Sequence, residues 1–295
     1  MLDYRVTTFL AVCDTMNFTK AAQRLNITQP AVSQHIRYLE EAYHTHLFLY
    51  QNKQLTLTKA GLLLRHRFTA MENDERALTS ELNSLSEGLE EIAMGVTMTI
   101  GEYAILTPLA RLLRHHPRLN LRLHFGNTAE LLRQIDTGRI QIALVEGFYP
   151  KERYVHRRFG EESFIGVCAS RHQFRSAPPQ SFADLLSERL LVREKGSGTR
   201  EILARSLALS GMKISDFRHF LEIGNMHSIL SLLQEDSGIS FLYRIAAEKG
   251  LQNGSLKEIP LPGFPIRHDF DFLWEKNSIY QEKYQALCTE LSSYR

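Results

Sequence analysis

Apolar residues recur at alternating steps of four and three along one stretch of the chain. Such heptad spacing predicts one long helix with a narrow apolar line on one side, here over residues 59–92, with Thr58 as a candidate N-cap. A helix that packs on a globular core usually has a wider apolar stripe. We therefore expect this helix to join two separate bodies and to pair with a second copy of the chain; a single amphipathic helix lying on a core is the alternative. The seam consists of Leu64, Phe68, Met71, Leu78, Leu82, Leu85, Leu89 and Ile92, with Glu75 as the exception.

After Gly95, segments of strand character alternate with segments of helix character. The order strand, helix, strand, helix, strand predicts a parallel sheet. Two such units in succession leave a cleft between them, which is the usual place for a small ligand. The first unit has strands near 96–100, 119–125 and 140–145 and helices near 106–114 and 129–136; the second has strands near 164–169, 190–192, 220–223 and 239–242 and helices near 182–186, 200–210 and 228–235; a strand at 270–274 and a helix at 278–291 follow.

Charge balance and hydropathy exclude several classes of protein. The chain has 35 lysine and arginine residues against 33 aspartate and glutamate residues, which speaks against a strongly basic nucleic-acid wrapper and against an acidic disordered tail. It lacks the roughly 18 consecutive apolar residues of a membrane helix, and Asp3 and Arg5 interrupt the place where a signal peptide has its apolar run. We therefore expect a soluble, cytoplasmic, multidomain protein with no membrane partner.

The cysteine and histidine residues form no recognisable redox or metal motif. Cys13, Cys168 and Cys288 are odd in number and widely spaced, which fits neither a disulfide framework nor a zinc ribbon. We expect them to be reduced core residues, with a redox switch between Cys168 and Cys288 as the less favoured alternative. The two closely spaced histidine pairs lack the spacing of a metal site, so no metal ion is expected.

Residues 18–40 have the pattern of a helix-turn-helix. Thr19 and Thr28 can cap its two helices, and Pro30 is tolerated in the first turn of the second helix, where the backbone amide needs no partner. The apolar residues of the second helix then face the core, which leaves polar side chains on its outer face. These are the residue types that contact base edges and phosphates in a major groove; a solvated polar face on a plain helical hairpin is the alternative. The outer-face residues are Gln29, Ser33, Gln34 and Arg37.

The residues that follow favour a DNA-binding head. Residues 47–61, LFLYQNKQLTLTKAG, predict a two-stranded wing with an Asn-Lys turn, followed by the cap of the long helix. With this wing, the N-terminal third resembles the LysR-type transcriptional regulators. The first helix of the motif begins with Phe18, AAQRLNITQPAVSQHIRYLE continues the motif, and LTLTKAG opens the long helix after the wing. Three later stretches, IGEYAILTPLARLLRHHPRLNLRL, GNTAELLRQIDTGRIQIALVEG and REKGSGTR, resemble the effector-binding domain of the same family. The resemblance covers essentially all 295 residues.

The resemblance implies the domain organisation and the partners. It implies an α/β fold class with a mainly α winged head, a homodimer that commonly assembles to a tetramer, and a double-stranded, pseudo-palindromic DNA operator. It also implies contact with RNA polymerase if the protein is an activator, and a small-molecule effector bound between two lobes. The expected parts are a winged helix-turn-helix DNA-binding domain over 1–58, a linker and dimerisation helix over 59–92, and a two-lobed effector-binding domain of the type 2 periplasmic-binding-protein kind over 93–295, with lobe I at about 93–162 and 266–295 and lobe II at about 163–265.

The wing departs from the family pattern. The family commonly has an arginine where this chain has Tyr50, and a basic pair where it has Lys53 and Gln54. With fewer cations to neutralise phosphates, we expect a lower non-specific affinity for DNA and a weaker dependence of that affinity on salt. The residues expected to contact DNA are Thr19, Thr28, Gln29, Pro30, Ser33, Gln34, Arg37 and Lys53.

The segment Arg193–Arg200, REKGSGTR, follows a predicted strand and opens a predicted helix. Its glycines permit a tight turn, and the backbone amides at a helix N-terminus favour an anion, to which both arginines can add bidentate pairing. The residue orders of a nucleotide P-loop and of a Rossmann fingerprint are absent, and an ordinary strand-to-helix turn is the alternative. We expect a small anion, either a carboxylate or an oxyanion such as sulfate or phosphate, and no cofactor. With the positions that the family resemblance implies, the expected effector-binding residues are Tyr103, Ala104, Asn127, Thr128, Arg193, Ser197, Gly198, Thr199, Arg200, Asn225 and His227.

Two other functions stay open at this point. A two-lobed small-molecule binding protein or enzyme without a DNA role would share the sheet, but it needs a signal peptide or a catalytic constellation and leaves the N-terminal third without a purpose. A helix-turn-helix adaptor that binds a protein instead of DNA is opposed by the polar outer face of the second helix. We therefore expect a transcriptional regulator that is not an enzyme.

Overall fold

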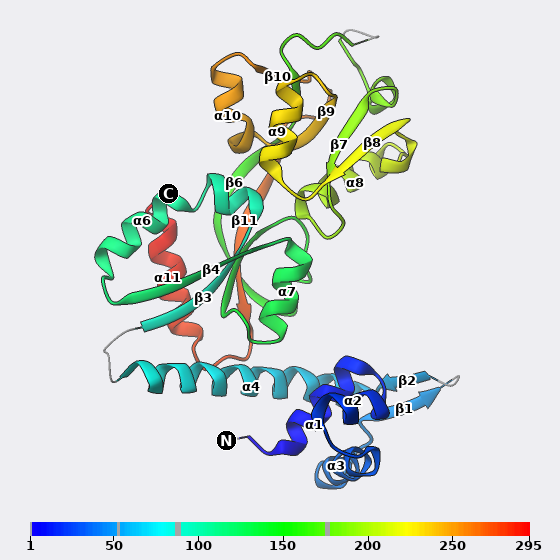
Figure 1. The fold of residues 1–295 in the computed structure, drawn as a ribbon, viewed down its shortest axis with the longest axis vertical. Helices are drawn as coiled ribbons and strands as arrows, with labels where there is room; N and C mark the ends of the chain where they lie inside the picture. Colours follow the sequence, from blue (N-terminus) through cyan, green and yellow to red (C-terminus); the bar gives the residue numbers. More distant parts are fainter. Residues whose placement is uncertain (1, 52–53, 86–89, 175–177) are drawn as a thin grey trace. The chain divides into compact units, whose positions relative to one another are not determined.

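The structure is a computed structural model that describes residues 2–51, 54–85, 90–174 and 178–295, and the chain divides into two compact units (Figure 1). None of the described helices is long and apolar enough to cross a membrane. The N-terminal unit comprises Met1–Gly88, Asp136–Gly138 and Lys276–Gln281, and the sheet unit comprises Leu89–Ile135, Arg139–Glu275 and Glu282–Arg295.

Three short helices, a two-stranded sheet and one long helix form the N-terminal unit. The apolar faces of the short helices meet in one core, in which Phe9 is fully buried. Its ring centroid lies 5.5 Å from that of Phe48 and 5.7 Å from that of Phe68, so the wing and the long helix close the core that the short helices leave open. The elements are α1 Tyr4–Thr15, α2 Phe18–Leu25, α3 Gln29–Ala42, β1 Phe48–Gln51, β2 Gln54–Leu57 and α4 Lys59–Leu85.

Helix α2 is capped by Asn17, whose side chain accepts a hydrogen bond from the Lys20 amide at 2.9 Å. The prediction that Thr19 caps this helix is therefore wrong: Asn17 has the extended backbone that a cap needs, whereas Thr19 already lies inside the helix. Asn26 ends α2 in the left-handed conformation, with φ at 56°. This turn directs the chain into α3 and completes the helix-turn-helix.

The other two predicted caps are present. The Thr28 hydroxyl accepts a hydrogen bond from the Ala31 amide at 3.4 Å and caps α3. The Thr58 hydroxyl accepts one from the Gly61 amide at 2.9 Å at the start of α4. Short polar residues before each apolar periodicity are therefore a reliable signal for both helix starts.

The long helix is confirmed as far as Leu85, and pairing through its seam stays a prediction. Helix α4 ends at Leu85, and Ile92 lies in strand β3, where it is buried and pairs with Leu121 of the neighbouring strand. The extension of the helix to residue 92 is therefore wrong, and Leu89 lies outside the described residues. Phe68 belongs to the core of the N-terminal unit. Three members of the seam remain exposed: Met71 by 48%, Leu78 by 46% and Leu82 by 57%.

One mixed sheet of nine strands runs through the sheet unit in the order β4-β3-β5-β11-β6-β9-β7-β8, with β10 paired to β6. Strands β4 and β5 are parallel to β3, and β8 and β9 are parallel to β7. The two predicted α/β units are thus confirmed as two lobes. Their elements are β3 Glu90–Thr97, α5 Met98–Tyr103, α6 Leu106–His115, β4 Leu119–Gly126, α7 Thr128–Asp136, β5 Ile142–Glu146, β6 Tyr154–Ala169, η1 Phe182–Leu185, β7 Arg189–Arg193, α8 Gly198–Leu209, η2 Ile214–Asp216, β8 His219–Ile223, α9 Met226–Gln234, β9 Ile239–Tyr243, α10 Arg244–Gln252, β10 Leu256–Glu258, β11 Ile266–Glu275 and α11 Gln281–Ser293.

Strands β6 and β11 belong to both lobes. They are antiparallel along the ten residues of β11, with an irregularity between Phe270 and Asp271. On one side β11 pairs with β5 of the first lobe, and on the other β6 pairs with β9 of the second lobe. The sheet is therefore mixed where the sequence predicted parallel pairing, because this two-stranded ribbon joins the two parallel sets (Figure 1).

Several predicted elements have other bounds. The strand predicted over 96–100 ends at Thr97, and α5 begins directly after it with Ile100 fully buried. The β-branched residues of this stretch suit a strand, but Thr97 is the last extended residue and serves as the N-cap position of the helix. The helix predicted from residue 278 begins at Gln281, and α10 and β10 were not predicted.

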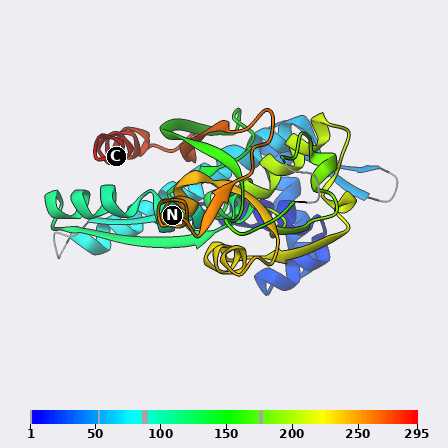
Figure 2. The ribbon, with the colours of Figure 1, turned by 90° about the horizontal axis from the view of Figure 1, so that it is seen from above.

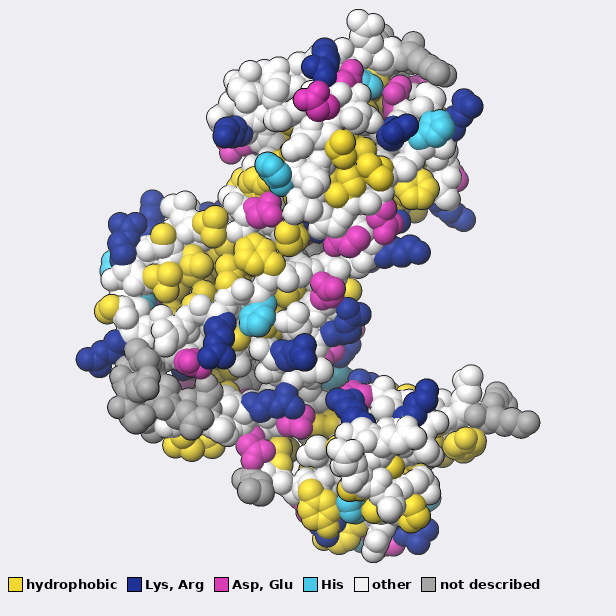
Figure 3. Space-filling view, viewed as in Figure 1, with side chains coloured by type: hydrophobic (Ala, Val, Ile, Leu, Met, Phe, Trp, Pro, Cys, Tyr) yellow, Lys and Arg dark blue, Asp and Glu magenta, His cyan; other side chains and the backbone are white. Residues whose placement is uncertain are grey.

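Helices α6 and α11 lie side by side in the sheet unit (Figures 1 and 2), where the Arg111 guanidinium donates to the Tyr294 carbonyl at 3.0 Å. The free face of this region is apolar. Figure 3 shows hydrophobic side chains gathered over the region of α6 and β4. Leu106 and Leu113 of α6 and Phe125 of β4 are exposed.

Candidate functional site

The outer face of α3 carries the polar side chains expected there. Gln29, Gln34 and Arg37 are exposed, and Ser33 is half-buried. The side-chain amide of Gln29 donates to the Ser33 hydroxyl at 2.9 Å, which orients both side chains at the start of the helix. Thr28 and Pro30, exposed in the cap and the first turn, lie on the same end of α3.

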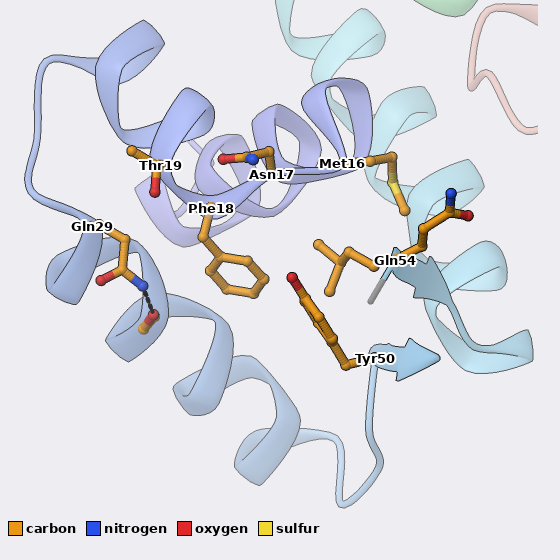
Figure 4. A pocket seen from close by; sticks show the side chains of 9 residues that line it. Met16, Asn17, Phe18, Thr19, Gln29, Tyr50 and Gln54 are labelled. Carbon is orange, nitrogen blue, oxygen red and sulfur yellow. Dashed lines mark hydrogen bonds between the residues drawn. The ribbon is translucent and has the colours of Figure 1, made fainter. Parts of the chain in front are cut away.

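A groove of about 710 Å³ lies between α2, α3 and the wing. It brings together Thr19, Gln29 and Ser33 from the predicted contact set, whereas Thr28, Pro30, Gln34 and Arg37 lie outside its lining, and Lys53 lies outside the described residues. Figure 4 shows the Tyr50 side chain projecting from β1 into this groove toward Phe18. The lining residues are Met16, Asn17, Phe18, Thr19, Gln29, Ser33, Tyr50, Gln54 and Leu55.

The second candidate site lies in the sheet unit, where the carboxyl ends of its strands converge. Glu146 ends β5 and is only 2% exposed. One of its carboxylate oxygens accepts a hydrogen bond from the Thr97 hydroxyl at the end of β3, and the other accepts one from the Thr199 hydroxyl on α8 at 3.1 Å. The Thr128 hydroxyl at the start of α7 donates to the Glu146 carbonyl at 2.9 Å. Residues of both lobes therefore meet at this glutamate.

Glycines allow the two lobes to approach at this point. Gly147 follows Glu146 with φ at 89°, and Gly198 opens α8. A Cβ atom on Gly198 would lie 2.3 Å from the Glu146 carbonyl oxygen. The end of β5 and the start of α8 thus touch through their backbones.

Arg193 is the buried cation nearest to this contact. It ends β7 and is 3% exposed. Its Nε and Nη2 atoms donate to the two carboxylate oxygens of Glu194 at 2.8 and 3.0 Å. Arg200, the second predicted arginine, donates to the Arg193 carbonyl at 2.6 Å and to Glu222 at 2.7 Å. Both arginines are therefore held by protein acceptors.

Four buried polar atoms near Glu146 have no hydrogen-bond partner within the described part of the chain. They come from four different elements and lie on residues that are at most 3% exposed. Buried polar groups are nearly always paired, so each of these atoms is free to bind a ligand or an ordered water. They are the Thr99 hydroxyl, the Arg193 Nη1 atom, the Ser197 hydroxyl and the Tyr243 hydroxyl.

Burial has the largest effect on the pKa values of Glu146 and Tyr243. It raises the pKa of the Glu146 carboxyl, and the hydrogen bond from Thr97, the charge of Arg193 and the hydrogen bond from Thr199 offset this rise only in part. Burial also raises the pKa of Tyr243 well above its ordinary value, and the charge of Glu146 adds to the effect. Tyr243 therefore remains a neutral hydroxyl that can donate or accept.

The structure separates the residues predicted for the effector site into two groups. Thr128, Gly198 and Thr199 contact Glu146, Ser197 directly precedes Gly198, and Arg193 acts on Glu146 through its charge. Asn127 lies beside this group: its side chain accepts from the Glu130 amide at 3.0 Å, and the Ala129 amide, two residues on, donates to the Gly196 carbonyl at 3.3 Å. Arg200 touches the group through Arg193.

The remaining four predicted residues lie elsewhere in the sheet unit. Tyr103, followed by Ala104, lies at the C-terminal end of α5 and packs on the apolar cluster of the second lobe. Asn225 caps α9 by accepting from the Ser228 amide at 3.0 Å, and His227 follows in the first turn of that helix. Among the described residues, no hydrogen bond joins any of the four to Glu146.

Sequence reasoning missed Thr97, Thr99, Glu146 and Tyr243. Thr97 and Glu146 end the parallel strands β3 and β5 at the same edge of the sheet, which is where ligands bind in open α/β sheets. That rule, applied to the predicted ends of β3 and β5, indicates Thr97 and Glu146. Thr99 and Tyr243 depend on how α5 and β9 pack, which no local pattern reveals.

The cysteines and the acidic residues form no second chemical centre in the part of the chain that the structure describes. Cys13, Cys168 and Cys288 are free and buried, and burial raises the pKa of Cys13 and Cys168 to about 12, so these thiols stay protonated at neutral pH. No group of three His, Cys, Asp or Glu side chains among the described residues is placed to hold a metal ion.

Two family profiles match the chain. The profile described as "Bacterial regulatory helix-turn-helix protein, lysR family" matches residues 5–62, and the profile described as "LysR substrate binding domain" matches residues 87–294. Together they cover both units.

Curated relatives match along most of their length. The transcriptional regulator CysL of Bacillus subtilis is 29% identical over 267 residues, which are 90% of this chain and 88% of the relative. The RuBisCO operon transcriptional regulator of Allochromatium vinosum is 27% identical over 272 residues, 91% of this chain and 88% of the relative. The transcriptional activator CmpR of Synechocystis is 27% identical over 275 residues, with the same shares.

Solved structures share the fold. An OxyR mutant of Corynebacterium glutamicum with bound H2O2 has a TM-score of 0.58 at 18% identity, and the match covers 99% of this chain and 93% of that one. The regulatory domain of CcmR from Synechocystis, in complex with 2-PG, has a TM-score of 0.61 at 17% identity, and the match covers 69% of this chain and 96% of that one. These matches show the fold of both units.

Proposed function

The chain belongs to the LysR family of transcriptional regulators, and we propose that it reads its operator with the outer face of α3 and answers to a small anion bound around Glu146. The family assigns DNA binding to the helix-turn-helix and effector binding to the sheet unit. The relatives are transcriptional regulators, and we infer no catalytic role. Action in the cytoplasm is consistent with the described helices, none of which suits a membrane.

For DNA reading, we place α3 in the major groove. Its exposed side-chain amide and guanidinium groups suit base edges, while the exposed polar side chains at its start can approach a phosphate. The groove that includes Tyr50 and Phe18 can receive a sugar-phosphate edge. We propose contacts from Thr19, Thr28, Gln29, Pro30, Ser33, Gln34 and Arg37, and from Lys53, which lies outside the described residues.

For the effector, the observation that carries the proposal is the set of four buried, unpartnered polar atoms around Glu146. Hydroxyl donors, one free guanidinium nitrogen and the N-terminus of α8 together suit a small oxyanion or carboxylate. The CcmR neighbour, which holds 2-PG, supports this ligand class. We propose Thr97, Thr99, Thr128, Arg193, Ser197, Gly198, Thr199 and Tyr243 as the binding residues, with Asn127 and Arg200 supporting them.

For assembly, we propose a homodimer through α4, with further pairing of sheet units into a tetramer. Met71, Leu78 and Leu82 expose the apolar seam that heptad pairing would cover. The apolar face over α6 and β4 in Figure 3 offers a second contact surface. A dimer places two recognition helices on a two-fold related site, and activation would proceed by contact with RNA polymerase.

A thermal-shift screen of the full chain against sulfate, phosphate, glycolate and 2-phosphoglycolate tests the effector site. A ligand at a hundred times its dissociation constant stabilises the folded state by roughly 2.7 kcal/mol. We expect a shift that is lost in Thr199→Val, which removes the hydroxyl but keeps the shape, and retained in Thr289→Val on the exposed face of α11. An equal shift in both variants would place the anion elsewhere.

A further inference from the structure

A carboxylate lies at the centre of the site proposed for an anion. Glu146 is 2% exposed, and two like charges in contact repel strongly where water is excluded. An anion cannot bind beside an ionised Glu146 without a large cost in electrostatic free energy. The inference drawn below rests on the proposed anion site and concerns how this conflict is resolved.

While Glu146 is ionised, the neighbouring threonine hydroxyls direct their protons at its carboxylate and cannot donate them to a ligand. A threonine hydroxyl has one proton and therefore donates one hydrogen bond. In the structure, Thr97 and Thr199 each donate to one oxygen of the Glu146 carboxylate. With both protons engaged, the two hydroxyls present only lone pairs to a ligand, and an anion needs donors.

Nearby cations do not neutralise Glu146. Arg193 directs Nε and Nη2 to Glu194, which itself carries a negative charge. On the strand paired with β5, Asp271 accepts from the Tyr149 hydroxyl at 2.5 Å. Tyr243 on β9 is neutral, and its hydroxyl has no partner among the described residues. Phe270, not Asp271, stands opposite Glu146 in this pairing, so the charges that act on Glu146 are one shared cation, Arg193, and one carboxylate, Glu194.

We propose that Glu146 takes up one proton from solvent when the anion binds. The protonated carboxyl then donates to one of the two threonine oxygens, and that threonine turns its own proton toward the anion. The anion and the proton enter together, so the net charge of the buried site does not change with a monovalent anion and falls by one unit instead of two with sulfate. Burial, which raises the pKa of Glu146 even before a ligand arrives, favours the same step.

This role makes Glu146 a specificity-determining residue. A ligand that is only an anion binds with proton uptake and binds more weakly as pH rises. A ligand that also carries an ammonium group, such as an amino acid, instead uses the ionised carboxylate as its acceptor and binds without a proton. The pH dependence of binding therefore distinguishes a simple anion from a ligand that also carries a cationic group.

Calorimetric titration of the full chain with sulfate measures how many protons the protein takes up on binding. The charge of sulfate is constant across neutral pH, so the ligand itself takes up none. We expect the binding enthalpy to vary with the ionisation enthalpy of the buffer, with a slope of about one proton taken up per sulfate at a pH above the pKa of Glu146 in the free protein. Over that range the affinity should fall about tenfold per pH unit. A slope of zero overturns the proposal, and absence of sulfate binding between about pH 6 and about pH 8 contradicts the anion site itself.

The variant Glu146→Gln keeps the shape and stays neutral. We expect its sulfate affinity to be independent of pH and to exceed that of the wild type at the alkaline end, with no proton uptake. Glu201→Gln, which removes an exposed carboxylate of α8 that pairs with Arg205, should keep the wild-type pH dependence. An unchanged pH dependence in Glu146→Gln overturns the proposal; if that variant does not fold, the proton count of the wild type decides.

Discussion

The backbone of Gly147 packs against that of Gly198 so closely that a Cβ atom on Gly147 would lie 2.5 Å from the Gly198 Cα atom. Gly147 also has φ at 89°, a conformation that residues with a side chain rarely adopt. The contact joins the end of β5 in the first lobe to the start of α8 in the second lobe, beside Glu146. Two independent constraints therefore require glycine at position 147.

Gly147→Ala is expected to be more destabilising than a substitution that strains the backbone alone. Gly211 has φ at 72° and open space around it, so Gly211→Ala is the matched control. Strain at such a position costs of order 1–3 kcal/mol, and Gly147→Ala adds the clash with Gly198 to it. Thermal denaturation should show the larger loss for Gly147→Ala, together with loss of the anion response; equal losses would mean that the contact between the lobes can relax.

Arg37→Ala is expected to weaken specific operator binding by about 1–3 kcal/mol, the value of one good bidentate base contact, without lowering the melting temperature. Arg37 is exposed on α3 and supports no core contact. Footprinting and titration on the operator measure the loss. Arg65→Ala removes a cation from α4 instead and should keep the footprint; an unchanged footprint in Arg37→Ala would remove this residue from the interface.

Tyr50→Arg is expected to raise non-specific DNA affinity and to steepen its dependence on salt. Tyr50 is 75% exposed at the tip of the wing, and one added phosphate contact increases the slope of log K against log salt by about 0.9. Fluorescence anisotropy on a random duplex at several salt concentrations measures the slope. The same slope in both proteins would show that this part of the wing stays away from the DNA backbone.

Leu82→Lys is expected to dissociate the dimer. Leu82 is 57% exposed in the seam of α4, and a charge at this position is costly to bury between two helices. Leu63→Lys, which introduces the same charge at a residue of α4 that is 59% exposed and not a member of the seam, should leave the dimer intact. Sedimentation velocity of the two variants separates these outcomes, and a dimeric Leu82→Lys protein would exclude the seam as the interface.

Glu146→Gln is expected to stabilise the free protein increasingly as pH rises. Because the pKa of Glu146 is raised on folding, the folded chain holds a proton that the unfolded chain loses above about pH 4.5, the ordinary value. The wild type therefore loses stability as pH rises from there through the folded pKa, and the glutamine variant lacks this loss. Denaturant titrations at several pH values measure the difference, and parallel curves would show that Glu146 ionises as easily in the folded chain as in the unfolded one.

Local patterns predicted the N-terminal unit well and the binding cluster less well. The caps at Thr28 and Thr58 and the outer face of α3 depend on residues within a few positions of one another. Ile92, in contrast, continues the heptad spacing but pairs with Leu121 in the sheet, so tertiary pairing overrides the local signal. Asn17 replaced Thr19 as the cap because both residues suit that role and only the backbone decides between them.

The binding cluster is distributed over residues far apart in the chain. Thr97 and Glu146 are 49 positions apart, and Glu146 and Thr199 are 53 apart. The family resemblance identified the turn that contains Ser197 and Thr199, because its glycines form a local motif. It did not identify Glu146, whose significance follows from its burial among hydroxyl groups of three other elements.

The ribbon of β6 and β11 limits how the two lobes can move. A two-stranded ribbon resists stretching, because its hydrogen bonds hold the strands in register, but it twists more readily than a wide sheet. The irregularity between Phe270 and Asp271 lies within this ribbon and is a point where torsion can concentrate. We expect the anion proposed to bind at Glu146 to rotate one lobe about the ribbon axis, and the torsional stiffness of the ribbon then determines how far a given binding free energy turns the lobe.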